Sequence, residues 1–255
     1  MQLTALPALD DNYIWHLADA SGQWLVVDPG DADPVLAHAG GAGPPGAILL
    51  THHHGDHVAG VAGLRARWPR MTVYGPADPR ISALVDRPVG EGDQVRVGPW
   101  TFEVLAVPGH TASHLAFHGL GLLFCGDTLF SLGCGRLFEG TPREMLGAMD
   151  RLSALPAATL VCCGHEYTLA NAAFARVVDP DNAALRRRHE EAIAMRHAAQ
   201  PTVPSTLAQE LACNPFLRID APAVRTALAA REPAAGHDRT DAFAALRRWK
   251  DGFRA

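Results

Sequence analysis

The sequence has few of the features that mark secreted, membrane-bound or nucleic-acid-binding proteins. Its 255 residues include only five cysteines, an odd number without regular spacing, which excludes the disulfide framework of small secreted domains. No apolar run approaches the roughly 20 residues that a membrane span needs, and the first residues, MQLTALPALDDNY, carry no basic leader for secretion. We therefore expect a cytoplasmic protein without a membrane partner.

The charge balance excludes further classes of partner. The formal net charge is -5, which gives no overall field that would attract nucleic acid or an anionic membrane surface. The chain also lacks a Gly-x-Ser-x-Gly nucleophile elbow and a P-loop. The basic run from Arg186 to His189 is followed by two glutamates, and we interpret it as the solvated face of a helix.

Short apolar runs, separated by glycine and proline, fill the first two thirds of the chain, and such runs predict buried strands. The predicted strands are Trp24 to Val27, Ala47 to Leu50, Met71 to Tyr74, Phe102 to Val107, Leu122 to Cys125 and Thr159 to Cys163. A helix is predicted to begin after Thr141, because Pro142 suits the first helical position and Glu144 completes a capping box.

After about residue 170 the strand signals end, and alanine, leucine and arginine recur at helical spacing. The predicted helices are Asn182 to His197, Thr206 to Cys213, Pro222 to Ala230 and Thr240 to Trp249. The length of the chain allows one large domain with a smaller appendage. We therefore predict an α/β catalytic domain over residues 1–170 and a helical, substrate-binding region over residues 171–255.

The segment THHHGDH, residues 51–57, has an unusual density of metal-binding side chains. Four of them lie within six residues, namely His52, His54, Asp56 and His57. Alternate side chains of an extended stretch point the same way, so we expect His52 and His54 to share one metal ion. Gly55 is expected to let the backbone turn, which frees the last two side chains for a second site.

Three further predicted strands end in a glycine followed by a metal-competent residue. These residues are His110, Asp127 and His165. Because the polar ends of strands in one sheet converge on one edge, the seven candidate ligands are enough for two metal sites. Imidazole and carboxylate without thiolate suit zinc, iron or manganese in an open catalytic site. The two oxygens of Asp127 make it the natural bridge between two metals.

The order His-x-His-x-Asp-His, Gly-His, Gly-Asp, Gly-His resembles the metal motifs of the metallo-β-lactamase superfamily, over about 170 residues. The resemblance implies an αββα sandwich with two divalent metal ions, zinc first of all, with iron and manganese as alternatives. It assigns the first metal to His52, His54 and His110. It assigns the second metal to Asp56, His57 and His165. Asp127 would bridge both metals, and Asp28 in VVDPG would hold a ligand histidine from outside.

Three further stretches resemble glyoxalase II, a thioesterase family of that superfamily. They are GDTLFSLGCGRLFEGT at 126–141, CGHEYT at 163–168, and NPFLR with RRWKD at 214–218 and 247–251. The resemblance maps the glutathione-binding positions to Arg136, Phe138, Tyr167, Arg247 and Lys250. Arg136 stands where the family often has lysine, which keeps the charge. Phe138 stands where tyrosine is common, so one hydroxyl contact is missing.

The resemblance implies hydrolysis of S-D-lactoylglutathione to glutathione and D-lactate, the second step of methylglyoxal detoxification. A hydroxide bridging the metals would attack the thioester, with Asp56 and Asp127 as catalytic carboxylates. The implied partner is a small glutathione thioester, whose two carboxylates would meet the basic patch of Arg136, Arg247 and Lys250. We expect a monomer.

Five alternatives stay open. A glutathione persulfide dioxygenase uses one iron held by two histidines and an aspartate, and would not need the second set of ligands. A lactonase or another thioesterase would keep both metals, but a lactonase or a β-lactamase leaves Arg247 and Lys250 unexplained. A metal-binding scaffold without activity would not need the full set of ligands.

Overall fold

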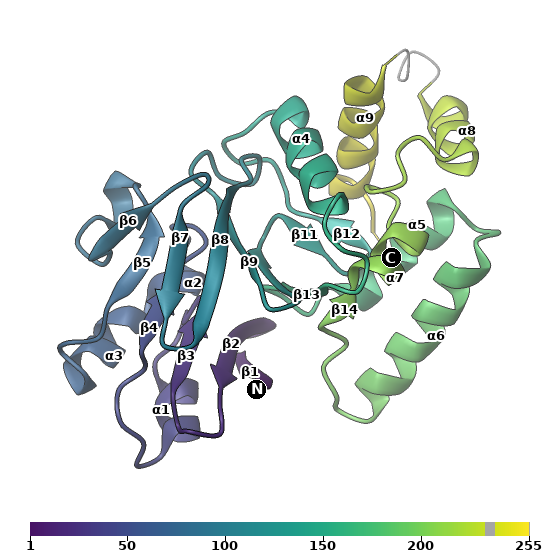
Figure 1. The fold of residues 1–255 in the computed structure, drawn as a ribbon. Coiled ribbons are helices and arrows are strands. Elements are labelled where there is room, and N and C mark those ends of the chain that lie inside the picture. The colour runs from purple at the N-terminus through teal and green to yellow at the C-terminus, as the bar shows by residue number, and fades with distance from the viewer. Residues whose placement is uncertain (233–237, 255) are drawn as a thin grey trace. The chain divides into compact units, whose positions relative to one another are not determined.

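The computed structural model describes residues 1–232 and 238–254 (Figure 1), and their contacts divide them into two units. Unit 1 comprises Met1–Ala106, Ser113–Gly126 and Cys162–His165. Unit 2 comprises Val107–Ala112, Asp127–Val161 and the described residues from Glu166 onwards. The chain thus crosses between the units several times, and each unit is described by itself.

Unit 1 is built on two sheets. The first has the strand order β1-β2-β3-β4-β5-β6, antiparallel from β1 to β3 and parallel from β3 to β6. Its strands are β1 (Gln2–Ala8), β2 (Asn12–Ala18), β3 (Trp24–Val27), β4 (Ala47–Leu49), β5 (Val73–Pro76) and β6 (Arg87–Val89). The β3 and β4 strands are fully buried, as expected for parallel strands covered on both faces.

The second sheet contributes four antiparallel strands to unit 1, in the order β10-β9-β8-β7. They are β7 (Gln94–Val97), β8 (Trp100–Ala106), β9 (Leu115–Gly119) and β10 (Leu122–Gly126). The end of β13 (Leu160–Cys163) lies beside β10, since the Gly164 amide donates to the Gly126 carbonyl over 3.0 Å. Trp15 of β2 meets Phe124 of β10 with ring centroids 6.5 Å apart, so the two sheets face each other.

Helices cover the other face of the first sheet in unit 1. They are α1 (Asp33–Ala39), α2 (Gly55–Val58), α3 (Gly60–Arg67) and the 3-10 helix η1 (Pro79–Ile81). Val35 of α1 and Leu64 of α3 belong to one buried cluster with Val26 and Ile48 of the sheet. This packing fixes the sheet edge from which the THHHGDH segment emerges.

Unit 2 is mainly helical. Its helices are α4 (Pro142–Ser153), α5 (Thr168–Val178), α6 (Ala183–His197), α7 (Leu207–Cys213), α8 (Pro222–Arg231) and α9 (Arg239–Asp251). A hairpin of β11 (Leu129–Phe130) and β12 (Gly133–Cys134) lies among them, and β14 (Ser205–Thr206) pairs with the start of β13. Within the described ranges, no helix combines the length and apolar character that crossing a bilayer requires.

Most predicted elements are present. The predicted strands at β3, β4, β8, β10 and β13 are observed with ends that differ by at most two residues. The predicted capping box of α4 is confirmed, with the Thr141 hydroxyl accepting from the Glu144 amide and Glu144 returning to the Thr141 amide. The expectation that strands end near residue 170 was wrong at β14, which consists of two residues that pair with Leu160 and Val161.

The two units do not divide the chain at residue 170. The α4 helix and the β11–β12 hairpin belong to unit 2, together with the C-terminal helices. The reason is local packing, because α4 contacts α9 and Asp150 of α4 receives two hydrogen bonds of 2.7 Å from Arg239 of α9.

Candidate metal centre and substrate site

Three predicted ligands in unit 1 converge on one point. The Asp56 Oδ2 atom lies 3.5 Å from His57 Nε2 and 3.4 Å from His165 Nε2, and the two imidazole nitrogens are 3.3 Å apart. A tetrahedral zinc ion with bonds of about 2.0–2.1 Å holds its ligand atoms about 3.3 Å from one another. These three side chains, which also form a cluster by proximity, therefore fit a metal ion.

The turn that brings Asp56 and His57 to this point is the start of α2. His54 is extended, with φ -60° and ψ 143°, and Gly55 begins the helix. The prediction that the turn depends on glycine was wrong, because a Cβ on Gly55 would meet no atom within 4 Å and its φ is not positive. The start of α2 itself turns the backbone between His52 and His54, which precede it, and Asp56 and His57, which lie in it.

The earlier pair of histidines faces each other as the alternation predicts. The His52 Nε2 atom lies 3.1 Å from His54 Nδ1. His53 turns elsewhere, with its Nδ1 atom 3.6 Å from Asp78 Oδ2. The His52 ring is fully buried and stacks on His114, with centroids 4.5 Å apart. This stacking restricts the His52 ring to one plane.

Asp28 orients two of the ligand histidines in unit 1. Its Oδ2 atom accepts from His57 Nδ1 over 3.1 Å and from the Thr51 hydroxyl over 2.6 Å. Because that hydroxyl donates to Asp28, its oxygen accepts from His52 Nδ1, 3.0 Å away. Both imidazoles therefore keep the lone pair of Nε2 for a metal. Asp28 is buried and has a positive φ of 51°.

Unit 2 holds the other two predicted ligands, His110 and Asp127. The His110 Nε2 atom lies 3.4 Å from Asp127 Oδ2, the same spacing as in unit 1. His110 Nδ1 donates to the Arg136 carbonyl over 2.9 Å, which places the proton on Nδ1 and the lone pair on Nε2. Glycine is required at position 135, since a Cβ there would overlap the Asp127 carbonyl.

The predicted glutathione-binding residues lie in unit 2. The Phe138 side chain is 63% exposed, and its ring centroid is 5.2 Å from that of His110. The Tyr167 ring packs edge-on against Phe130 at 5.1 Å. The segment that carries Arg136 and Phe138 thus contacts His110, a predicted metal ligand, through the Phe138 ring and the Arg136 carbonyl.

The three predicted cations gather near the end of α9. Burial, and then the charges of Arg247 and Arg136, lower the pKa of Lys250 to about 8. The Arg136 side chain is 66% exposed, and its Nε atom lies 3.8 Å from Asp251 Oδ1. A basic patch of Arg136, Arg247 and Lys250 is therefore present in unit 2.

Arg247 has a structural task that the sequence did not reveal. It is only 4% exposed, and its Nη1 atom donates to the Cys134 carbonyl over 2.7 Å. Its Nε and Nη2 atoms donate to Asp251 Oδ1 over 3.1 and 2.9 Å. Since these donors are engaged, Arg136 and Lys250 are the cations of the patch with more room to meet a ligand.

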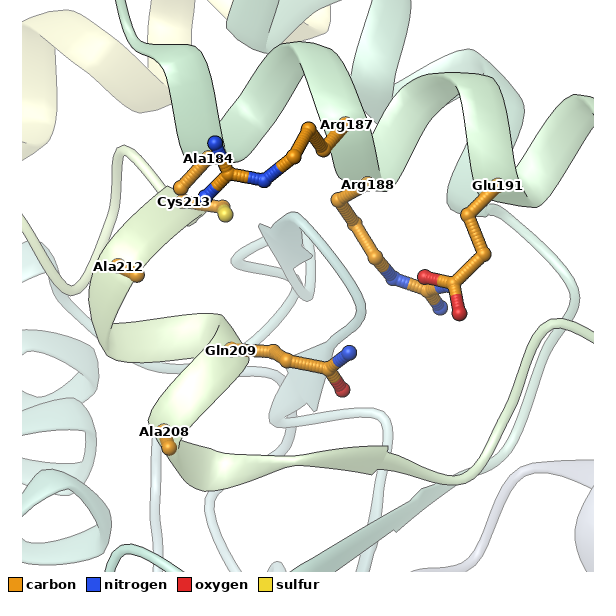
Figure 2. Close-up of a pocket in the computed structure, with 8 residues that line it drawn as sticks. All are labelled: Ala184, Arg187, Arg188, Glu191, Ala208, Gln209, Ala212 and Cys213. Atoms are coloured by element: carbon orange, nitrogen blue, oxygen red, sulfur yellow. The ribbon is translucent and has the colours of Figure 1, made fainter.

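The interpretation of the basic run at 186–189 as a solvated face was wrong for Arg188. Its side chain is 5% exposed and donates to Glu191 over 3.0 Å and to the Thr202 carbonyl over 2.5 Å. In Figure 2 the Arg188 side chain extends from α6, and Gln209 lies on α7. Both residues line a cavity of about 450 Å³. None of the predicted ligands or glutathione-binding residues lines this cavity.

Sequence reasoning missed two residues that contact the ligands of unit 1. Asp11 Oδ1 lies 2.7 Å from His165 Nδ1, and Asn12 Nδ2 donates to Asp56 Oδ2 over 3.0 Å. In the sequence, DDNY has the composition of an ordinary polar turn. All five cysteines are buried thiols outside any disulfide, and such thiols pack as small apolar side chains.

Comparison with known proteins shows the superfamily and the family to which the chain belongs. The family described as "Metallo-beta-lactamase superfamily" matches residues 13–165, and "Hydroxyacylglutathione hydrolase C-terminus" matches residues 166–253. A hydroxyacylglutathione hydrolase of Xanthomonas axonopodis pv. citri (strain 306) is 59% identical over 100% of both chains. The chain therefore belongs to the hydroxyacylglutathione hydrolase, or glyoxalase II, family of that superfamily. The predicted family and fold class are thereby confirmed.

Solved structures share the fold. ETHE1 from Myxococcus xanthus matches with a TM-score of 0.64 and 24% identity, over 97% of this chain and 98% of that one. TTHA1623 in a di-iron-bound form matches with a TM-score of 0.54 and 30% identity, over 65% of this chain and 92% of that one. The first likeness concerns the fold alone.

Proposed function

We propose that this protein hydrolyses S-D-lactoylglutathione to glutathione and D-lactate at a centre of two divalent metal ions. The observation that carries the proposal is the convergence of Asp56, His57 and His165 at tetrahedral spacing. The substrate follows from the name and full-length similarity of the Xanthomonas relative. Five free, buried cysteines support a reducing compartment, so we place the enzyme in the cytoplasm, as a monomer.

The proposed ligands follow the order of the motifs. His52, His54 and His110 would hold the first metal. Asp56, His57 and His165 would hold the second. Asp127 would serve as a ligand of both, and the 3.4 Å between its Oδ2 atom and His110 Nε2 supports a shared metal for that pair. We propose zinc, with iron or manganese as alternatives, because the ligands are imidazoles and carboxylates. When bound, two such ions lower the pKa of a water from 15.7 to about 7 and polarise a thioester carbonyl.

The residues of the chain prepare this chemistry by fixing tautomers. In each of four histidines the Nδ1–H group donates a hydrogen bond to an oxygen of the chain. His52 donates to the Thr51 hydroxyl, His57 to Asp28, His110 to the Arg136 carbonyl and His165 to Asp11. Each arrangement directs a neutral Nε2 inward. The carboxylates of Asp56 and Asp127 accept hydrogen bonds from the attacking water, which orients its lone pair toward the thioester carbonyl.

Unit 2 supplies the proposed glutathione contacts. Arg136 and Lys250 attract the glutathione carboxylates, Tyr167 offers a hydroxyl, and Phe138 offers an exposed apolar face. The glutathione thiolate leaves without a protein acid, because a thiol pKa of about 8.5 makes it a good leaving group. These contacts favour a glutathione thioester, which carries two carboxylates, over a simple lactone, which carries none.

The test is turnover of S-D-lactoylglutathione by the metal-loaded protein, followed through loss of the thioester absorbance. We expect rapid hydrolysis by the wild type and a raised KM, with nearly unchanged kcat, for Lys250→Ala. Arg248→Ala, an exposed cation on the same helix that pairs with Glu232 at 2.7 Å, is the matched control. Hydrolysis of a lactone but not of the thioester would contradict the proposed substrate.

A further inference from the structure

The turn between β1 and β2 lies against the predicted second metal site. The two strands pair from Gln2 with Ala18 to Ala8 with Asn12, which leaves a tight turn of Leu9, Asp10 and Asp11. Leu9 adopts a positive φ of 52°, a conformation that non-glycine residues seldom take. This reversal places Asp11 at the end of the turn and Asn12 at the first position of β2.

The backbone of β2 is aligned with the segment that carries His165. Asn12 and His165 form an isolated antiparallel bridge, and the Tyr13 amide donates to the Gly164 carbonyl over 2.8 Å. The position of His165 therefore depends on the start of β2 as well as on the end of β13.

Asp11 fixes the tautomer of His165. A carboxylate only accepts, so the contact of 2.7 Å between Asp11 Oδ1 and His165 Nδ1 requires the proton on Nδ1. The Nε2 atom then carries the lone pair, and this atom lies 3.3 Å from His57 Nε2. The Asp11 side chain is 42% exposed, so its other face is solvated.

Asn12 holds Asp56 at two points. Its Nδ2 group donates to Asp56 Oδ2 over 3.0 Å and to the Asp56 carbonyl over 3.2 Å. Asn12 is only 7% exposed, so water competes little for these bonds. The same amide thus restrains both the main chain and the carboxylate of one ligand.

We propose that Asp11 and Asn12 are positioning residues that set the affinity of the second metal site separately from the first. Both contact ligands of the second site, whereas His52 of the first site is oriented through Thr51 and Asp28. The inference rests on the proposed centre of two metals. It extends that proposal to two residues that are not among the proposed ligands but contact them.

The test compares Asp11→Ala, Asn12→Ala and Asp11→Asn with wild type, using Asp10→Asn on the exposed neighbouring aspartate as control. Zinc per chain is measured against graded concentrations of a competing chelator, and the cobalt-loaded proteins are compared by absorption spectroscopy. We expect both alanine variants to bind the second equivalent about 10–100-fold more weakly and the first equivalent as wild type does. The Asp11→Asn variant should lose less affinity for the second equivalent, because its amide oxygen still accepts the hydrogen bond from His165 Nδ1.

Two results separate failure of the inference from failure of the proposed function. Suppose that wild type binds two equivalents of zinc. The separate role of Asp11 and Asn12 is overturned if the alanine variants bind both equivalents as tightly as wild type does, or if both equivalents are weakened to the same extent. If wild type itself binds one equivalent, the two-metal centre is contradicted, and the inference falls with it. Thermal unfolding of the metal-free variants checks folding, and Asp11→Asn keeps the test valid if a buried alanine variant unfolds.

Discussion

At the scale of single residues, Lys250 combines a specific place with an altered acidity. It is the only lysine in the sequence, and it lies in the predicted glutathione site. Burial and the nearby arginines lower its pKa to about 8, so the ammonium loses its charge just above neutral pH. Because the folded pKa lies below the unfolded value of about 10.4, the charged form also opposes folding at neutral pH.

We therefore expect KM for the thioester to rise as pH increases through about 8, since the neutral amine no longer attracts a carboxylate. Lys250→Arg should flatten this rise, because a guanidinium keeps its charge with a pKa of about 12 or more. Steady-state kinetics across this range, at constant ionic strength, provide the measurement. An equal rise of KM in Lys250→Arg would show that another group is responsible.

Asp28 is a second residue whose role is testable alone. Asp28→Asn retains the size of the side chain but places an amide N–H toward Thr51 or His57, where only acceptors are useful. We expect metal affinity to fall about 10–100-fold. Competition between the protein and a zinc chelator measures the loss, with Asp31→Asn as a nearby control. Unchanged affinity for both metals would contradict the orienting role of Asp28.

At the scale of elements, the β11–β12 hairpin is held by buried polar side chains. Asn214 Nδ2 donates to the Phe130 and Gly133 carbonyls over 3.1 and 2.9 Å, and Glu210 Oε2 accepts from the Leu132 amide over 2.8 Å. The hairpin leads directly to the segment that contacts His110. The NPFLR stretch therefore has a structural role, because its asparagine, Asn214, donates hydrogen bonds to the carbonyls of the hairpin.

Asn214→Ala should destabilise the protein by about 2–4 kcal/mol, because it leaves two buried carbonyls without donors. Urea unfolding measures the change, and Gln209→Ala, which removes only one side of a helix cap, should cost about 1 kcal/mol. A loss for Asn214→Ala no greater than for the control would mean that water replaces the asparagine.

Elements were predictable where their signals are local. The α4 helix carries its own cap in Thr141 and Glu144, so a few adjacent residues define its start. The α5 helix was missed because it begins after Tyr167 without a side-chain cap. The β7 strand was missed because its residues alternate between exposed and buried, which weakens the apolar signal.

At the scale of the whole molecule, metal binding is expected to stabilise the fold. A ligand at about 1,000 times its Kd adds about 4 kcal/mol, which corresponds to about 10 °C in Tm for a protein of this size. Removal of metal with a chelator should lower Tm by that order, and zinc should restore it. Calorimetry of wild type and His165→Ala gives the comparison. Identical Tm with and without metal would contradict a site that forms only in the folded chain.

The candidate metal ligands could be proposed from the sequence because most of them lie in short motifs, as in residues 51–57. The residues that orient them could not be, since contacts such as Asn12 with Asp56 and Asp11 with His165 span 44 and 154 positions. Asp28 was found only through the family resemblance. Long-range partners of this kind leave no periodicity in the sequence, because they are chosen by the fold and not by neighbouring residues.

The span of 154 residues between Asp11 and His165 has a consequence for synthesis of the chain. A ribosome releases Asn12, Asp56 and His57 well before His165. The nascent chain therefore carries the proposed ligands Asp56 and His57 without His165 while residues 58–164 are made. In the proposed two-metal centre, full coordination of the second metal would wait until β13 has emerged and paired beside β10, so its loading would mark the completion of unit 1.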